Sequence, residues 1–226
     1  MSSNRNVVLA TEEIYHIFNR GVERREIFTD KWEYRRALGT MNYYRFLEPP
    51  IRYSKYIILE EKRRIQLLNA LLTSQLQVDI LAFCLMPNHF LLLLKQTANA
   101  GISRFVSKSC DSYSKYFNIK HDRVGPLFQG PFKAVRVESE EQLIHLSRYI
   151  HLNPISSFFI KESELDSYSW SSLPEYLAPQ GNTLSNPTFI GGLFKSPTGY
   201  RDFIHNQIDY AQKMECIKHL AFEEKE

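Results

Sequence analysis

The sequence predicts an α+β protein with a ferredoxin-like antiparallel sheet, helices mainly on one face of the sheet, and a C-terminal helical extension. Segments of strand and helix character follow in the order strand, helices, two strands, helix, strand, helix, which suits this layout. Two apolar runs, residues 78–86 and 90–95, are separated by Pro87 and Asn88, a hairpin signal. With 226 residues and 43% hydrophobic content, the chain can bury one core.

The first half of the chain begins with a predicted strand. Residues 13–20 are aromatic and β-branched and end at Gly21. Asp30 is a suitable N-cap for a helix to about residue 47, and residues 60–75 carry leucines at helical spacing. The two apolar runs that follow are expected to be strands buried on both faces, at the centre of the sheet.

The second half predicts a helix, a strand and another helix. Residues 99–119 repeat apolar side chains every three to four positions, and residues 132–137 form a short strand after a loop rich in Gly and Pro. Ser139 precedes a helix over residues 140–152, which Asn153 and Pro154 are expected to end.

Two units are expected along the chain. We assign residues 1–178 to one domain and residues 179–226 to a C-terminal extension packed on it, in which residues 199–221 look helical. The beginning of the chain has no apolar core of signal-peptide length, and no apolar run reaches membrane-spanning length. A cytoplasmic protein without a membrane partner is therefore expected.

Positive charge is concentrated in one segment. The formal net charge is only +3, but residues 99–136 contain seven Lys and Arg against two Asp, a local net charge of +5. Such a field attracts a phosphate backbone and makes binding depend on salt, although a solvated helix face would have the same composition.

The segment MPNHFLLL, residues 86–93, resembles the HUH strand of single-strand transposases, in which two histidines flank one hydrophobic residue. Alternate residues on a strand share a face, so a His-x-His pair points both imidazoles at one divalent metal. His89 stands at the first position, but Leu91 stands at the second and cannot bind a metal. A lone histidine beside a turn is otherwise a hydrogen-bonded structural residue.

Further motifs, in the same order and spacing, resemble the REP-associated tyrosine transposases, a bacterial branch of that superfamily. The match extends over about residues 13–178, so the first domain is expected to be an HUH transposase-like domain. The motifs are YHIFNRG (15–21), YFN (116–118), GPLFQGPFK (125–133), RYIHLNP (148–154) and WSS (170–172).

The resemblance implies an enzyme that cleaves and rejoins single-stranded DNA through a 5′-phosphotyrosine. Tyr149 takes the nucleophile's position, and Asn153, four residues later on the same helix face, completes a metal site with His89. A phenol with a pKa near 10 is a poor nucleophile at neutral pH, so the implied Mg²⁺ or Mn²⁺ matters for activating the phosphate. His145 or His16 are candidates to replace the missing ligand.

The expected partner is single-stranded or hairpin DNA, bound by a monomer or homodimer. Leu91 favours an alternative function, a catalytically impaired, domesticated DNA-binding or regulatory protein, whereas the retained Tyr149 and Asn153 favour the enzyme. A third interpretation is an RNA-binding module with the same sheet topology. The sequence lacks the aromatic strand motif that such modules use for base stacking, which disfavours it. The candidate DNA-binding residues are Arg20, Arg24, Arg25, Arg104, Lys108, Lys115, Arg123, Lys133 and Arg136.

Overall fold

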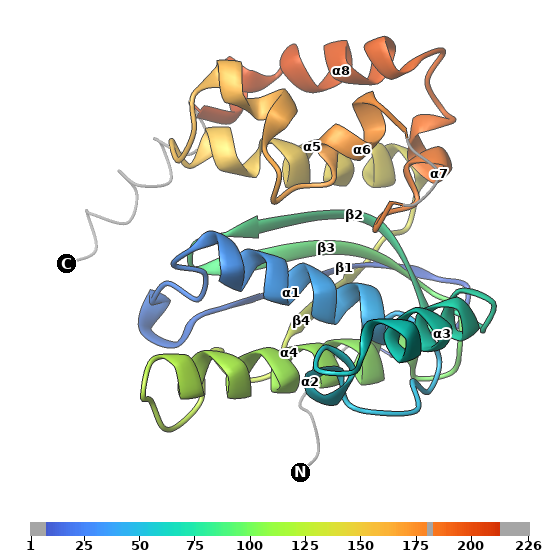
Figure 1. The fold of residues 1–226 in the computed structure, drawn as a ribbon. Coiled ribbons are helices and arrows are strands. Elements are labelled where there is room, and N and C mark those ends of the chain that lie inside the picture. The colour runs from blue at the N-terminus through green and yellow to red at the C-terminus, as the bar shows by residue number, and fades with distance from the viewer. Residues whose placement is uncertain (1–7, 180–182, 213–226) are drawn as a thin grey trace.

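A computed structural model describes residues 8–179 and 183–212 of the chain (Figure 1). The predicted helix over residues 199–221 therefore lies partly outside the described residues. In chain order the elements are β1 (Ile14–Arg20), η1 (Val22–Arg24), α1 (Lys31–Tyr44), α2 (Tyr53–Tyr56), α3 (Glu61–Leu72), β2 (Val78–Met86), β3 (His89–Gln96), α4 (Gly101–Lys120), β4 (Lys133–Arg136), α5 (Glu140–Ser156), η2 (Glu162–Ser167), α6 (Leu173–Leu177), α7 (Pro187–Gly191) and α8 (Pro197–His205).

The four strands form one antiparallel sheet in the order β2-β3-β1-β4. The α+β fold class is thus confirmed, but the prediction that both hairpin strands lie at the sheet's centre is wrong for β2, which is an edge strand. β2 is nevertheless buried because a later segment covers its outer edge. Backbone hydrogen bonds join Leu85 to Trp170 (2.8 Å), Phe83 to Ser172 (3.0 Å) and Ile80 to Asn186 (2.8 Å).

Helices cover both faces of the sheet, not mainly one as expected. α1 and α4 pack on one face, and α5 with the helices after it packs on the other (Figure 1). The cause lies in β2 and β3, whose successive residues are apolar on both sides, so each face needs a cover. The two resulting hydrophobic cores lie on opposite faces of the same sheet.

α5 continues through Pro154 to Ser156, past the end that the sequence predicts. A proline in a helix removes one backbone donor, but the last turn is closed by other groups. The backbone N–H of Ser157 donates to the Asn153 carbonyl at 3.1 Å, and the Ser157 hydroxyl donates to the same oxygen at 2.7 Å. Asn153 is therefore fixed inside the helix rather than on a loop.

A buried histidine ties α5 to the helices that follow. The ring nitrogens of His151 hydrogen-bond with the Ser172 hydroxyl at 2.7 Å and the Tyr200 hydroxyl at 2.8 Å, and the side chain is fully buried. Ser172 in turn accepts from the Phe83 N–H of β2. Among the described helices, none is both long and apolar enough to cross a membrane.

Candidate active site

The sheet face that α5 covers carries the candidate site. Side chains at positions 89, 91 and 93 of β3 point to this face, and the register places Arg20, Phe18 and His16 of β1 directly opposite them. Cross-strand partners share a face, so the segment that resembles the HUH strand lies beside β1. Leu91 and Leu93 belong to the core under α5.

His89 and Asn153 meet across the gap between β3 and α5. The His89 Nε2 atom lies 3.0 Å from Asn153 Oδ1, and its Nδ1 atom lies 2.7 Å from Asn88 Oδ1. Asn153 is buried, with 8% of its surface exposed. The two residues expected to share a metal are therefore in contact, and Asn88 orients the imidazole ring from the hairpin turn.

Tyr149 lies one helical turn before Asn153 and remains accessible, with 44% of its surface exposed. Its ring meets the ring of His16 edge-on, with centroids 6.1 Å apart. The candidate nucleophile thus borders β1, while Asn153 borders the end of β3 at His89. The helix spacing that the sequence indicates places both residues over the same sheet.

His16 is unusual among the buried polar residues. Only 8% of its surface is exposed, and its Nε2 atom has no hydrogen-bond partner within the described parts of the chain. Burial lowers the pKa of His16 to about 4, because the charged imidazole is poorly solvated there. A buried nitrogen without a partner is costly, which makes this position a functional candidate.

The residues present do not fit a resident Mg²⁺ or Mn²⁺ site. His89 and Asn153 supply one nitrogen and one amide oxygen, and Leu91, 4% exposed, is part of the core. The described residues contain no group of three His, Cys, Asp or Glu able to hold a metal ion. The implied metal site is therefore incomplete in this chain.

Neither candidate replacement ligand completes the set. His16 lies opposite Leu93, four residues along β3 from His89, which corresponds to about 13 Å of strand. His145 lies on the exposed side of α5, where its Nδ1 is 2.7 Å from an Arg148 nitrogen. The structure thus brings His16 to Tyr149 rather than to His89, and leaves His145 outside the site.

Two of the predicted DNA-binding cations flank the site. Arg20 ends β1 opposite His89, is exposed, and donates from Nε to Gln129 Oε1. Lys133 begins β4 opposite Phe18, and its ammonium lies 6.0 Å from the centre of the Phe18 ring. Positive charge is thus present around Phe18, on the side of this face away from His16.

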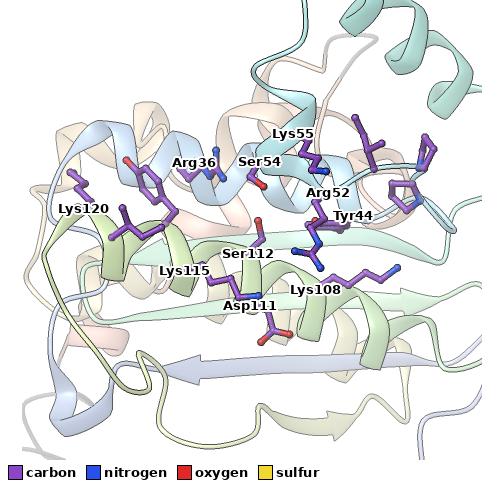
Figure 2. Close-up of a pocket in the computed structure, with 15 residues that line it drawn as sticks. Arg36, Tyr44, Arg52, Ser54, Lys55, Lys108, Asp111, Ser112, Lys115 and Lys120 are labelled. Atoms are coloured by element: carbon purple, nitrogen blue, oxygen red, sulfur yellow. The ribbon is translucent and has the colours of Figure 1, made fainter.

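Two other predicted cations lie on the opposite side of the sheet. Lys108 and Lys115 of α4 line a groove of about 1040 Å³ between α4, α1 and the α2 segment. Figure 2 shows Arg52 extending from the α2 segment toward α4, where both lysines lie. The cations lining this groove, which we call the basic groove, are Arg36, Arg52, Lys55, Lys108, Lys115 and Lys120.

The remaining predicted cations lie elsewhere. Arg24 is exposed on the turn after β1, and Arg104 is turned inward, away from the basic groove. Four of them bond to neighbouring side chains: Arg25 to Glu23 (3.2 Å), Arg104 to Gln77 (3.1 Å), Arg123 to Asn118 (3.1 Å) and Arg136 to Glu13 (2.7 Å). The predicted DNA-binding residues missed four cations of the groove, Arg36, Arg52, Lys55 and Lys120. The first three have no local pattern that relates them to α4.

Comparisons with known proteins agree with this architecture. One solved structure, of a REP-associated tyrosine transposase bound to a REP hairpin, aligns with a TM-score of 0.51, at 13% identity, over 82% of this chain and 91% of that one. No curated protein matches the sequence. The family model described as "Transposase IS200 like" matches residues 40–153, half of the chain, including His89, Tyr149 and Asn153. The chain belongs to the IS200-like transposase family.

Proposed function

We propose that this chain binds single-stranded DNA next to a hairpin, in the cytoplasm, and cleaves and rejoins it through a covalent 5′-phosphotyrosine on Tyr149. The observation that carries the proposal is the placement of Tyr149 and Asn153 on α5, directly over the sheet face where His89 contacts Asn153 at 3.0 Å. An exposed phenol beside fixed polar groups is the arrangement that phosphoryl transfer to tyrosine needs.

The chain's own residues supply positioning and charge. In the proposed reaction the Tyr149 oxygen attacks the phosphorus, the bond from phosphorus to the 3′ oxygen breaks, and a free 3′-hydroxyl leaves; rejoining is the reverse. Arg20 and Lys133 lie on the same sheet face near Phe18, where they can neutralise phosphates of DNA that reaches Tyr149. His89 and Asn153 offer polar atoms that can orient a phosphate oxygen.

The relative bound to a REP hairpin supports hairpin DNA as the partner. We propose that the basic groove holds the phosphate backbone of such a hairpin. Within the described residues, six cations line the groove against one acidic side chain, Asp111. The groove lies beyond the sheet from Tyr149, so the proposal divides DNA contacts between a catalytic face and a holding face (Figures 1 and 2).

A second candidate function is supported by Leu91. A leucine at the position of the second metal-binding histidine, packed into the core, points to a chain that binds hairpin DNA but has lost cleavage. The same experiment separates the two functions, because binding and cleavage are read independently.

We expect the protein to form a covalent adduct with a hairpin that carries a single-stranded 5′ extension, drawn from the flanks of its own gene. Denaturing gels would show the adduct in the unchanged protein, and Tyr149→Phe should reduce it by at least about 10³-fold, because no other group replaces the nucleophile. Tyr210→Phe, at an exposed tyrosine after α8, is the matched control.

The outcomes separate the readings. An adduct that persists in Tyr149→Phe contradicts the assignment of the nucleophile. Hairpin binding by both proteins without any adduct supports the DNA-binding alternative. If the unchanged protein does not bind the hairpin at all, both functions are contradicted.

Hairpin affinity is expected to depend on the basic groove. Replacing Lys108 and Lys115 with glutamine should weaken binding and reduce the slope of log K against log salt by about 1.8, the value for two lost phosphate contacts. The control with the same charge change is Lys62→Gln with Arg63→Gln, at exposed positions of α3 outside the groove. Equal salt slopes in both double variants would show that the groove does not hold DNA.

A further inference from the structure

We propose that His16 accepts the phenolic proton of Tyr149 when DNA is bound, and so acts as the general base of the strand-cleavage reaction. The inference rests on the proposed function, since it assigns a role to a second residue of the same site. The contact between His89 and Asn153 does not involve His16, which β1 positions beside Tyr149.

Geometry is the first argument. β1 holds His16 at the centre of the sheet, opposite Leu93 of β3 and Val135 of β4, and Tyr149 contacts its ring edge-on at a centroid distance of 6.1 Å. Phe18, two residues along the same face, packs against the imidazole with ring centroids 5.0 Å apart. The imidazole is thus packed between neighbouring rings, while Tyr149, 44% exposed, is accessible to DNA.

The second argument is the unused hydrogen-bonding capacity of His16. Its Nε2 atom is buried and lacks a partner among the residues that the structure describes, and only 8% of the residue's surface is exposed. A neutral imidazole has one nitrogen free to accept a proton. The ring that carries this nitrogen contacts the nucleophile's ring, so the nitrogen can gain its partner when substrate binding reorients the phenol.

Charge near His16 changes when DNA arrives. The charged or titratable groups on the same face are Tyr149 of α5, Arg20 of β1, Asp79 of β2, His89 and Lys95 of β3, and Lys133 of β4. Lys95 is ion-paired with Glu12 at 2.6 Å. In the free protein burial keeps His16 neutral, which is the form that accepts a proton. A phosphodiester placed between Tyr149 and Lys133 adds negative charge, which favours the imidazolium and makes His16 a stronger base.

The proton balance needs no other reactant. The Tyr149 O–H bond breaks as an N–H bond forms on His16, and the phenolic oxygen forms its bond to phosphorus. The bond from phosphorus to the 3′ oxygen then breaks, and the imidazolium returns the proton, directly or through water, to that oxygen. In the rejoining step the 3′-hydroxyl gives its proton to His16 and its oxygen forms the bond to phosphorus. The bond from phosphorus to the Tyr149 oxygen breaks, and that oxygen takes the proton back from the imidazolium.

The test compares His16→Phe with the unchanged protein in single-turnover adduct formation on a hairpin with a single-stranded extension, between pH 5.5 and 9. Phenylalanine keeps the ring between Phe18 and Tyr149 and removes the partnerless nitrogen, so the thermal midpoint should not fall. We expect the rate to drop about 100-fold or more. The rate of the unchanged protein should level off above the pKa of bound His16, whereas the variant's rate should keep rising with pH.

His145→Gln is the matched control, since His145 is an exposed histidine one helical turn before Tyr149 that bonds to Arg148. It should leave the rate and the pH profile unchanged. An unchanged rate and profile in His16→Phe would overturn the proposal, even if hairpin binding is intact.

A measurement that does not depend on cleavage separates this proposal from the proposed function. In the complex with an uncleavable phosphonate analogue of the same hairpin, the ¹⁵N signal of His16 Nε2 should report an accepted hydrogen bond and should shift in Tyr149→Phe. If no adduct forms in any protein, the proposed function fails. An Nε2 signal that is the same in the presence and absence of the Tyr149 hydroxyl overturns the role of His16, whatever the activity.

Discussion

We expect the Leu91→His variant to form the covalent adduct much faster when a divalent metal is added. Positions 89 and 91 point to the same face of β3, so the variant presents two imidazoles beside Asn153. We expect Mn²⁺ to raise the rate of adduct formation by about 100-fold or more over EDTA, because a bound cation stabilises the charge on the attacked phosphate by several kcal/mol. The unchanged protein should respond to Mn²⁺ far less.

Stability gives an independent reading of the same variant. Leu91 is 4% exposed, so an imidazole there should lower the free energy of unfolding by about 2–4 kcal/mol in EDTA. Mn²⁺ at about 100 times its dissociation constant should restore about 2.7 kcal/mol. Leu92→His, at the next position of β3 but on the other face of the sheet, should be destabilised without this recovery. Equal recovery in both variants would show that the metal does not bind between positions 89 and 91.

The stability of the protein is expected to fall steeply on acidification below pH 6.5, chiefly because of His151. Burial lowers the pKa of His151 to about 3, whereas the unfolded chain titrates near 6.5. Between these values the unfolded state binds the additional proton, so the free energy of unfolding should decrease by up to about 1.4 kcal/mol for each pH unit. His16, with a pKa lowered to about 4, acts in the same direction.

Urea unfolding at several pH values between 7.5 and 5 measures this slope. His151→Gln should be less stable at pH 7.5 by about 1–3 kcal/mol, because the bonds to Ser172 and Tyr200 are imperfectly replaced, but its stability should depend less on pH. His145→Gln, at an exposed position, should retain the full slope. A slope in His151→Gln equal to that of the unchanged protein would contradict this account.

Local patterns were sufficient to predict most elements of the fold. Asp30 caps α1 with hydrogen bonds of 2.8 and 3.0 Å to the next turn, and Ser139 caps α5, as the side-chain chemistry predicts. The errors concern non-local contacts. No property of residues 78–86 reveals that a segment about ninety residues later covers β2. Pro154 indicates a helix end, but the helix continues because serines after the proline form the bonds that close its last turn.

The site was predictable to the extent that it follows from spacing along one element. Tyr149 and Asn153 lie four apart on one helix, and their facing a common sheet follows from that spacing. The contact of His16 with Tyr149 depends on how α5 packs over β1, and the basic groove depends on how α1, α2 and α4 pack. Both arise from tertiary packing, which residue patterns do not encode locally.

The covered edge of β2 has a consequence for how copies of the chain meet. An uncovered edge strand with apolar side chains on both faces invites strand addition from another molecule and eventual aggregation. Here the backbone around Trp170, Ser172 and Asn186 occupies the hydrogen-bonding groups of β2. At the other end of the sheet, β4 is only four residues long, and its exposed positions include Lys133 and Arg136. Intermolecular pairing is therefore blocked at one edge by the chain itself and opposed at the other by charge and short length.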